Sequence, residues 1–146
     1  MPVVLLLGGC LVVMAMVPRL VADGIYTKEQ AERGRVLYDG NCADCHGTKL
    51  EGGTSAPLAG DDFFASWSRP ELTLDDFYYI VRKTMPKEAA GTLSREAYAD
   101  VVAYILQQNG FPAGDKELKP EPAVMKAVRL DKPMPRDTTV PPPAPR

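Results

Sequence analysis

The chain has 146 residues, of which 45% are hydrophobic and 25% charged, and its formal net charge at pH 7 is -2. This length and composition suit one small globular domain with appended segments. The slightly acidic balance, 17 Lys and Arg against 19 Asp and Glu, argues against nucleic acid as a partner, because phosphates require a basic face.

The chain begins with an apolar segment, residues 3–17, which two glycines interrupt. The segment is short for a membrane span, so residues 1–22 are predicted to be a secretory signal peptide cleaved after Ala22. Two alternatives stay open. The segment could be retained as a membrane anchor, or Cys10 could be lipidated, since the Leu-Gly-Gly before it resembles a lipobox. Each alternative places the protein in the periplasm or at the outer face of the cytoplasmic membrane.

A first helix is predicted after this segment. Thr27 and Gln30 have the spacing of a capping box, and Tyr26 stands at the position of a hydrophobic staple. One face of the helix then carries Ala31, Gly34, Leu37 and Tyr38. The helix is expected to end at Gly40.

The sequence Cys42-Ala-Asp-Cys45-His46 follows directly. Two thiols separated by two residues and followed by an imidazole are the attachment signature of a c-type haem. Each thiol adds across a vinyl group of the porphyrin, and the imidazole becomes an axial ligand of the iron. The motif therefore predicts one covalent haem c with its iron. Because bacteria attach this haem after translocation, the motif agrees with an exported chain.

Two other uses of a Cys-x-x-Cys pair fit less well. Tetrahedral zinc needs four ligands, and the chain offers only one histidine and one further cysteine, Cys10, in the apolar segment. A thioredoxin-like dithiol needs an α/β context. Here a helical pattern precedes the motif, and a glycine-rich loop, residues 47–60, follows it.

Two more helices are predicted. Thr73 and Asp76 form the next capping box, and the apolar stripe behind it comprises Leu74, Phe77, Ile80 and Val81. The third helix begins at Ser94 and ends at Asn109-Gly110. Its apolar stripe comprises Tyr98, Val101, Val102, Ile105 and Leu106.

Residues 111–146 differ in kind, because they contain nine of the 14 prolines and no sustained apolar period. They predict an extended, partly disordered tail. Within it, residues 123–130 are compatible with a short helix that docks back on the domain through Val124, Ala127 and Val128. The expected organisation is therefore a signal peptide or anchor at 1–22, a haem domain at 23–110 and a tail at 111–146.

The second axial ligand can be narrowed by elimination. His46 is the single histidine, so a second imidazole is excluded, and the ligand must be a methionine, another side chain or nothing. Beyond the signal segment only Met85, Met125 and Met134 remain. Met85 follows the second predicted helix and precedes Pro86, which stops that helix. Met85 is the predicted ligand, with Met134 and a role in core packing as alternatives.

From about Thr27 to Asn109 the chain resembles class I monohaem c-type cytochromes, in particular small bacterial exported ones and the cytochrome modules of quinoprotein dehydrogenases. The resemblance implies an all-α fold in which three main helices and their loops enclose one haem. It also implies that Gly34 and Tyr38 on the first helix pack against Tyr104 on the last.

The resemblance implies further residues around the haem. Pro57 would accept a hydrogen bond from the His46 ring nitrogen that does not bind iron, and Leu58 would pack on the porphyrin. Trp67 resembles the family tryptophan near a propionate, with a core-filling role as the alternative. The predicted cofactor-binding set is Cys42, Cys45, His46, Pro57, Leu58, Trp67 and Met85, of which His46 and Met85 bind the metal.

A six-coordinate iron has no free position for a substrate, so the predicted function is one-electron transfer between redox partner proteins and not catalysis. The chain would be a periplasmic or membrane-associated carrier of relatively high potential. The alternative is a tethered subunit of a larger membrane redox complex, such as a dehydrogenase, a quinol-oxidising complex or a photosynthetic reaction centre. A haem sensor or peroxidase is disfavoured, because no second histidine can serve as a distal base.

Overall fold

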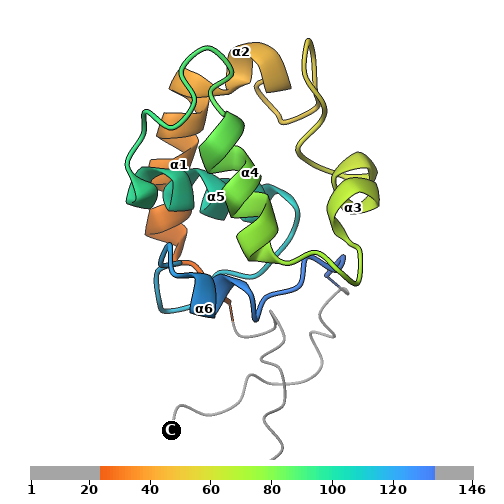
Figure 1. The fold of residues 1–146 in the computed structure, drawn as a ribbon, viewed down its shortest axis with the longest axis vertical. Helices are drawn as coiled ribbons and strands as arrows, with labels where there is room; N and C mark the ends of the chain where they lie inside the picture. The colour runs from red at the N-terminus through yellow and green to blue at the C-terminus, as the bar shows by residue number, and fades with distance from the viewer. Residues whose placement is uncertain (1–23, 134–146) are drawn as a thin grey trace, which may run out of the picture.

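The computed structural model describes residues 24–133, and within that range the regular elements are helices, with no strand. Figure 1 shows α1 and α4 on either side of α5, α2 at one end and α6 at the other. The elements are α1 (Lys28–Asn41), α2 (Ala43–His46), α3 (Asp61–Trp67), α4 (Leu74–Thr84), α5 (Arg95–Gln108) and α6 (Pro122–Met125). The all-α prediction is confirmed.

The predicted signal peptide, Cys10 and Met134 lie outside the described residues. Within residues 24–133 the structure contains no helix that is both long and apolar enough to cross a membrane.

The main packing contact joins α1 to α5, at the place where Gly34 allows the two backbones to approach. A Cβ atom at Gly34 would lie 1.8 Å from the Asp100 carbonyl oxygen and 3.0 Å from the Tyr104 Cβ. One turn later the rings of Tyr38 and Tyr104 meet with their centroids 5.3 Å apart. The predicted packing of the first helix on the last is therefore confirmed.

The start of α1 departs from the predicted capping box. Thr27 caps the helix, because its hydroxyl accepts a hydrogen bond of 3.1 Å from the Gln30 N–H. The Gln30 side chain does not return to Thr27. Its amide instead donates to the Leu118 carbonyl at 3.0 Å and accepts from the Leu118 N–H at 2.7 Å. Gln30 and Leu118 are both buried, so the backbone N–H and carbonyl of Leu118 cannot bond to water and take the Gln30 amide as their partner.

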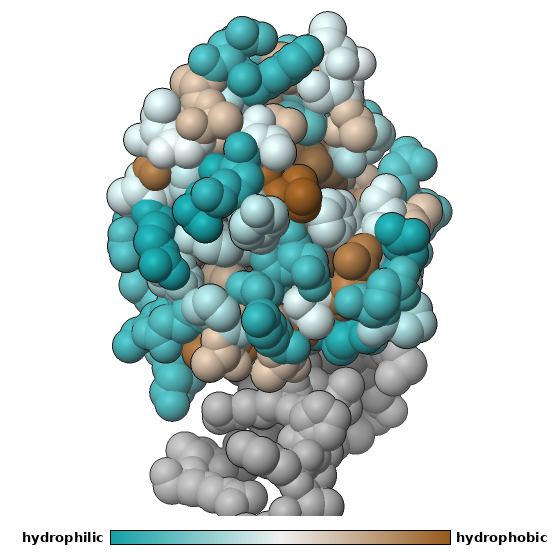
Figure 2. Space-filling model, in the orientation of Figure 1, coloured by the Kyte–Doolittle hydropathy of each residue, from teal (hydrophilic) through white to brown (hydrophobic). Residues whose placement is uncertain are grey.

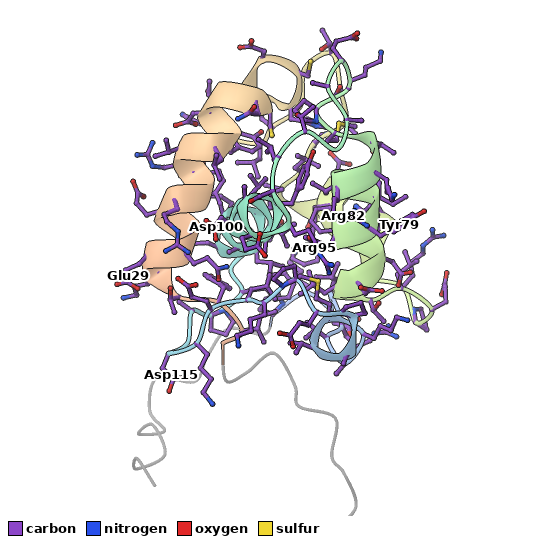
Figure 3. The ribbon with its side chains drawn as sticks, turned by 60° about the vertical axis from the view of Figure 1, so that its left-hand side comes forward. Glu29, Tyr79, Arg82, Arg95, Asp100 and Asp115 are labelled. Atoms are coloured by element: carbon purple, nitrogen blue, oxygen red, sulfur yellow. The ribbon has the colours of Figure 1, made fainter. Side chains whose placement is uncertain are left out.

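The second predicted helix forms as α4, and its capping box is present, with the Thr73 N–H donating to the Asp76 carboxylate at 2.8 Å. The predicted stripe is wrong at Ile80, which is 43% exposed. Tyr78 occupies the buried face in its place. Ile80 and its neighbour Tyr79 are both exposed, and Figure 3 shows Tyr79 on the side of α4 that faces away from α5.

The third predicted helix forms as α5 with the expected limits. The Ser94 hydroxyl accepts from the Ala97 N–H at 3.0 Å, and Gly110 follows the C-cap Asn109 with a φ of +78°. A positive φ is a conformation that glycine adopts without strain. Every residue from Tyr98 to Leu106 is buried, so α5 is the central helix of the domain.

Helix α3 was not predicted. It begins after Gly60 with Asp61 and Asp62, two carboxylates that suit the positive end of a helix. Its Phe63 is buried and packs edge-to-face on Phe77 of α4, with the ring centroids 5.5 Å apart. Only seven residues long, α3 offers too little apolar periodicity for recognition from sequence.

Residues 111–133 pack along the domain instead of leaving it. Much of this C-terminal segment is irregular, but five of its apolar side chains are buried: Phe111, Leu118, Met125, Val128 and Leu130. The Leu74 N–H, at the start of α4, donates to the Val128 carbonyl at 2.9 Å. The predicted docking helix is only the short α6, and Val124, expected on its buried face, is 41% exposed.

Candidate functional site

The cysteine and histidine side chains are presented by the junction of α1 and α2. Cys42 caps the end of α1, its N–H donating to the Tyr38 carbonyl at 2.8 Å, and it also precedes α2. The Tyr38 hydroxyl donates to the Gly47 carbonyl just beyond the motif at 2.7 Å. Gly47 has a φ of +84°, and a Cβ there would collide with Glu51. These contacts fix both ends of the motif.

His46 is buried, and its ring is held by the backbone of the following loop. Its Nδ1 lies 2.7 Å from the Ala56 carbonyl oxygen. A carbonyl can only accept, so Nδ1 carries the proton and Nε2 keeps its lone pair for a metal. The prediction that Pro57 is the acceptor is wrong by one residue. The Pro57 ring packs beside Gly52, where an added Cβ would lie 3.0 Å from it.

The loop that holds His46 is itself fastened to α5 through Asn109. The buried Asn109 amide donates to the Leu58 carbonyl at 2.9 Å, and its oxygen accepts from the Gly60 N–H at 3.0 Å. The Leu58 N–H also donates to Leu50 at 2.9 Å. Sequence analysis assigned Asn109 only the end of a helix, because its partners lie about fifty residues away and leave no local signal.

The two cysteines of the motif form no disulfide. Cys42 is partly buried and Cys45 is exposed. Burial, with a smaller contribution from the neighbouring Cys45, raises the pKa of Cys42 to about 11. Before haem attachment the Cys42 thiol is therefore neutral at pH 7. Within residues 24–133 no group of three or more His, Cys, Asp and Glu could hold a metal ion.

Met85 stands at the C-cap of α4 in an extended conformation. Its N–H donates to the Val81 carbonyl at 3.0 Å, and its carbonyl accepts from the Tyr98 hydroxyl at 2.7 Å. The Met85 side chain is only partly buried, whereas Met125 is fully buried in the core. Core packing therefore accounts for Met125, whereas Met85 is the partly exposed methionine among residues 24–133.

The family model described as cytochrome C oxidase, cbb3-type, subunit III matches residues 29–105. The matched range is more than half of the chain and contains the Cys-x-x-Cys-His motif. The chain belongs to this cytochrome c family. It is a monohaem c-type cytochrome that carries covalently bound haem c with its iron and serves electron transfer.

No curated protein matches this cytochrome. Among solved structures, a chain in the crystal structure of the sulfane dehydrogenase SoxCD from Paracoccus pantotrophus is similar to it, with 29% sequence identity and a TM-score of 0.53. The similarity covers 75% of this cytochrome and 58% of that chain. The cytochrome thus spans little more than half the length of its structural relative.

The residues around the motif fit a haem c. Two cysteine thiols outside any disulfide and an imidazole that is held through its Nδ1 are the donor set that attachment requires. Apolar side chains that pack against the core yet remain partly exposed include Leu58, Phe64, Trp67 and Leu93. Figure 2 shows strongly apolar surface near the centre of the face that it presents.

Trp67 ends α3 and lies edge-on to Phe77, with the ring centroids 4.8 Å apart. This contact supplies the core-filling role that was the alternative for Trp67. Its proposed place beside a propionate stays a prediction.

Proposed function

We propose that this cytochrome carries single electrons with its iron held between His46 and Met85. The observation that carries the proposal is the bond from His46 Nδ1 to the Ala56 carbonyl, which leaves Nε2 as the free nitrogen of a buried imidazole. The position of Met85 supports the proposal, because this partly buried methionine is the C-cap residue of α4.

The roles of the side chains follow from this arrangement. The Ala56 carbonyl orients the imidazole and raises its basicity. The Met85 thioether and apolar neighbours such as Leu58 favour the less charged state of the iron, which raises the reduction potential. A haem c bound here supplies one-electron chemistry between Fe(III) and Fe(II). If His46 and Met85 both held the iron of a bound haem, the chain would act as an electron carrier and would offer no site for a substrate.

The ligation is tested by absorption spectroscopy of the exported, haem-loaded protein. The oxidised wild type is expected to show the weak near-infrared band of methionine bound to iron, and Met85→Ala to lose it. Met125→Leu is the matched control, because Met125 is buried in the core and its replacement should keep the band. A band that survives in Met85→Ala would refute the proposed ligand.

A second candidate is a cytochrome subunit or docking module of a larger redox enzyme. The similarity to a chain in the structure of a sulfane dehydrogenase favours it, because that chain is part of a redox enzyme. Native protein that co-purifies in fixed ratio with a dehydrogenase or oxidase would support the subunit role. A free monomer that exchanges electrons with several partners would support the independent carrier.

We also propose that the cytochrome is exported through residues 1–22. The mass of the native protein tests this. A mass for residues 23–146 plus one haem indicates cleavage, whereas a heavier species that retains the apolar segment or acyl chains indicates a membrane tether.

A further inference from the structure

We propose that Tyr98 is a positioning residue for the methionine ligand, because its hydroxyl holds the backbone of Met85. This inference rests on the proposed ligation by Met85. It concerns a residue of α5 that lies 13 positions further along the chain and that sequence analysis assigned only to the apolar stripe.

The contact is well built. Tyr98 is 1% exposed, and its hydroxyl donates to the Met85 carbonyl at 2.7 Å. Among residues 24–133 the same carbonyl has one other donor, the Gly91 N–H, at the long distance of 3.4 Å. Tyr98 therefore provides the strong bond to this oxygen. Without it the carbonyl keeps a weak partner, and the turn after α4 loses its main anchor.

The anchor is effective because α5 is rigid. All residues of α5 from Tyr98 to Leu106 are buried, and the helix runs between α1 and α4 (Figure 3). At its other end Asn109 holds the Leu58 carbonyl, two residues after the Ala56 carbonyl that orients His46. One helix thus fixes the loop of the first axial ligand and the turn of the second.

Loss of the Tyr98 hydroxyl should let the Met85 turn open more often. An external ligand such as carbon monoxide can bind the reduced iron only while methionine is away from it. Removal of one ordinary buried hydrogen bond raises an open population about fivefold. We expect the rate of carbon monoxide binding to rise by about this factor in Tyr98→Phe, and the near-infrared methionine band to weaken.

Tyr78 provides a matched control. It is 5% exposed, lies on α4, and its hydroxyl donates to the Arg95 carbonyl at 3.0 Å. Tyr78→Phe therefore deletes the same kind of bond between the same two helices, but not one to the Met85 turn. Any general loosening of the domain should appear equally in both variants.

The experiment compares wild type, Met85→Ala, Tyr98→Phe and Tyr78→Phe as haem-loaded proteins, by the near-infrared band and by the rate of carbon monoxide binding. Each change from tyrosine removes one oxygen and keeps the ring, and far-ultraviolet circular dichroism verifies the fold. Faster binding in Tyr98→Phe alone supports the inference. Equal rates in Tyr98→Phe and wild type, or equal acceleration in both tyrosine variants, overturn it.

The two proposals fail in different ways. If Met85→Ala keeps the methionine band and binds carbon monoxide no faster than wild type, the ligation by Met85 is wrong. If Met85→Ala loses the band while Tyr98→Phe behaves as wild type does, the ligation stands and the positioning role of Tyr98 is refuted.

Discussion

The two segments assigned to the axial ligands are held in different ways. The histidine segment, residues 42–60, is held by hydrogen bonds within itself. The Gly52 N–H donates to the His46 carbonyl at 2.8 Å, and the Ser55 N–H donates to the Cys45 carbonyl at 3.0 Å. The methionine segment, residues 85–93, has six consecutive exposed residues, 87–92. The bond from Tyr98 ties this segment to α5, and the bond from the Met85 N–H to the Val81 carbonyl ties it to α4.

The difference indicates which side opens first. Local opening is easiest where few apolar side chains are buried and few bonds are shielded from water. The methionine segment meets this description, and the histidine segment, whose Leu50 and His46 are buried, does not. We therefore expect variants that loosen α5 to affect both segments, and variants at the edges of the domain to affect one.

The largest effect is expected from Gly34→Val, because α5 supports both segments and α1 packs on it at Gly34. An added Cβ would lie 1.8 Å from the Asp100 carbonyl oxygen, so the helices must separate. The expected loss in free energy of unfolding is about 3 kcal/mol or more, measured by chemical denaturation. The control is Gly40→Ala, also in α1, where an added Cβ meets nothing within 4 Å. This change should instead stabilise by about 0.5 kcal/mol or more.

Met125→Ala should have the next largest effect, because it opens a cavity under the C-terminal segment that holds the start of α4. Met125 is fully buried, and truncation of such a side chain costs about 2–5 kcal/mol. Thermal unfolding of the haem-loaded protein measures the loss. The neighbouring Val124→Ala is the control, since Val124 is 41% exposed. Equal losses in the two variants would show that residues 111–133 do not support the domain.

Asn109→Ala tests the histidine segment alone. The change leaves the partly buried Leu58 carbonyl and the Gly60 N–H without their partner on α5, which should cost about 2 kcal/mol. The methionine band should remain in the folded protein. Asn41→Ala serves as control, because the Asn41 side chain bonds to Leu37 on the exposed surface and should cost far less. A lost methionine band in Asn109→Ala would contradict the separation of the two segments.

The smallest expected effect is the loss of stability at low pH that arises from Asp76. Hydrogen bonds from the side chain and the backbone of Thr73 lower the pKa of Asp76. The folded state therefore binds this proton less readily than the unfolded chain, and the bond stabilises above the unfolded pKa of about 3.9. The stabilisation is lost as pH falls through the lower folded value. Asp76→Asn should reduce stability by about 0.5–1 kcal/mol at pH 7, and this deficit should shrink toward pH 3. A deficit of constant size across that range would contradict the assignment.

Contacts could be predicted from the sequence when the two residues that make them lie close together along the chain. The helix starts at Thr27, Thr73 and Ser94 were predicted because a cap and its partner lie three residues apart. The acceptor for His46 was placed one residue too far, at Pro57 instead of Ala56. Composition predicted an extended tail from residue 111, but its widely spaced apolar residues reach the core individually, without any period.

By itself the sequence determined the chemistry of this cytochrome. Cys42 caps one short helix that contains Cys45 and His46, so their spacing along the chain also sets their spacing in space. Only the tertiary structure decided what holds that chemistry in place. Tyr98 and Asn109 act on carbonyls 13 and 51 residues away, and such bonds depend on how α5 packs against the rest of the domain. The sequence sets the spacing of neighbouring residues directly, whereas partners far apart along the chain come together only when the core packs.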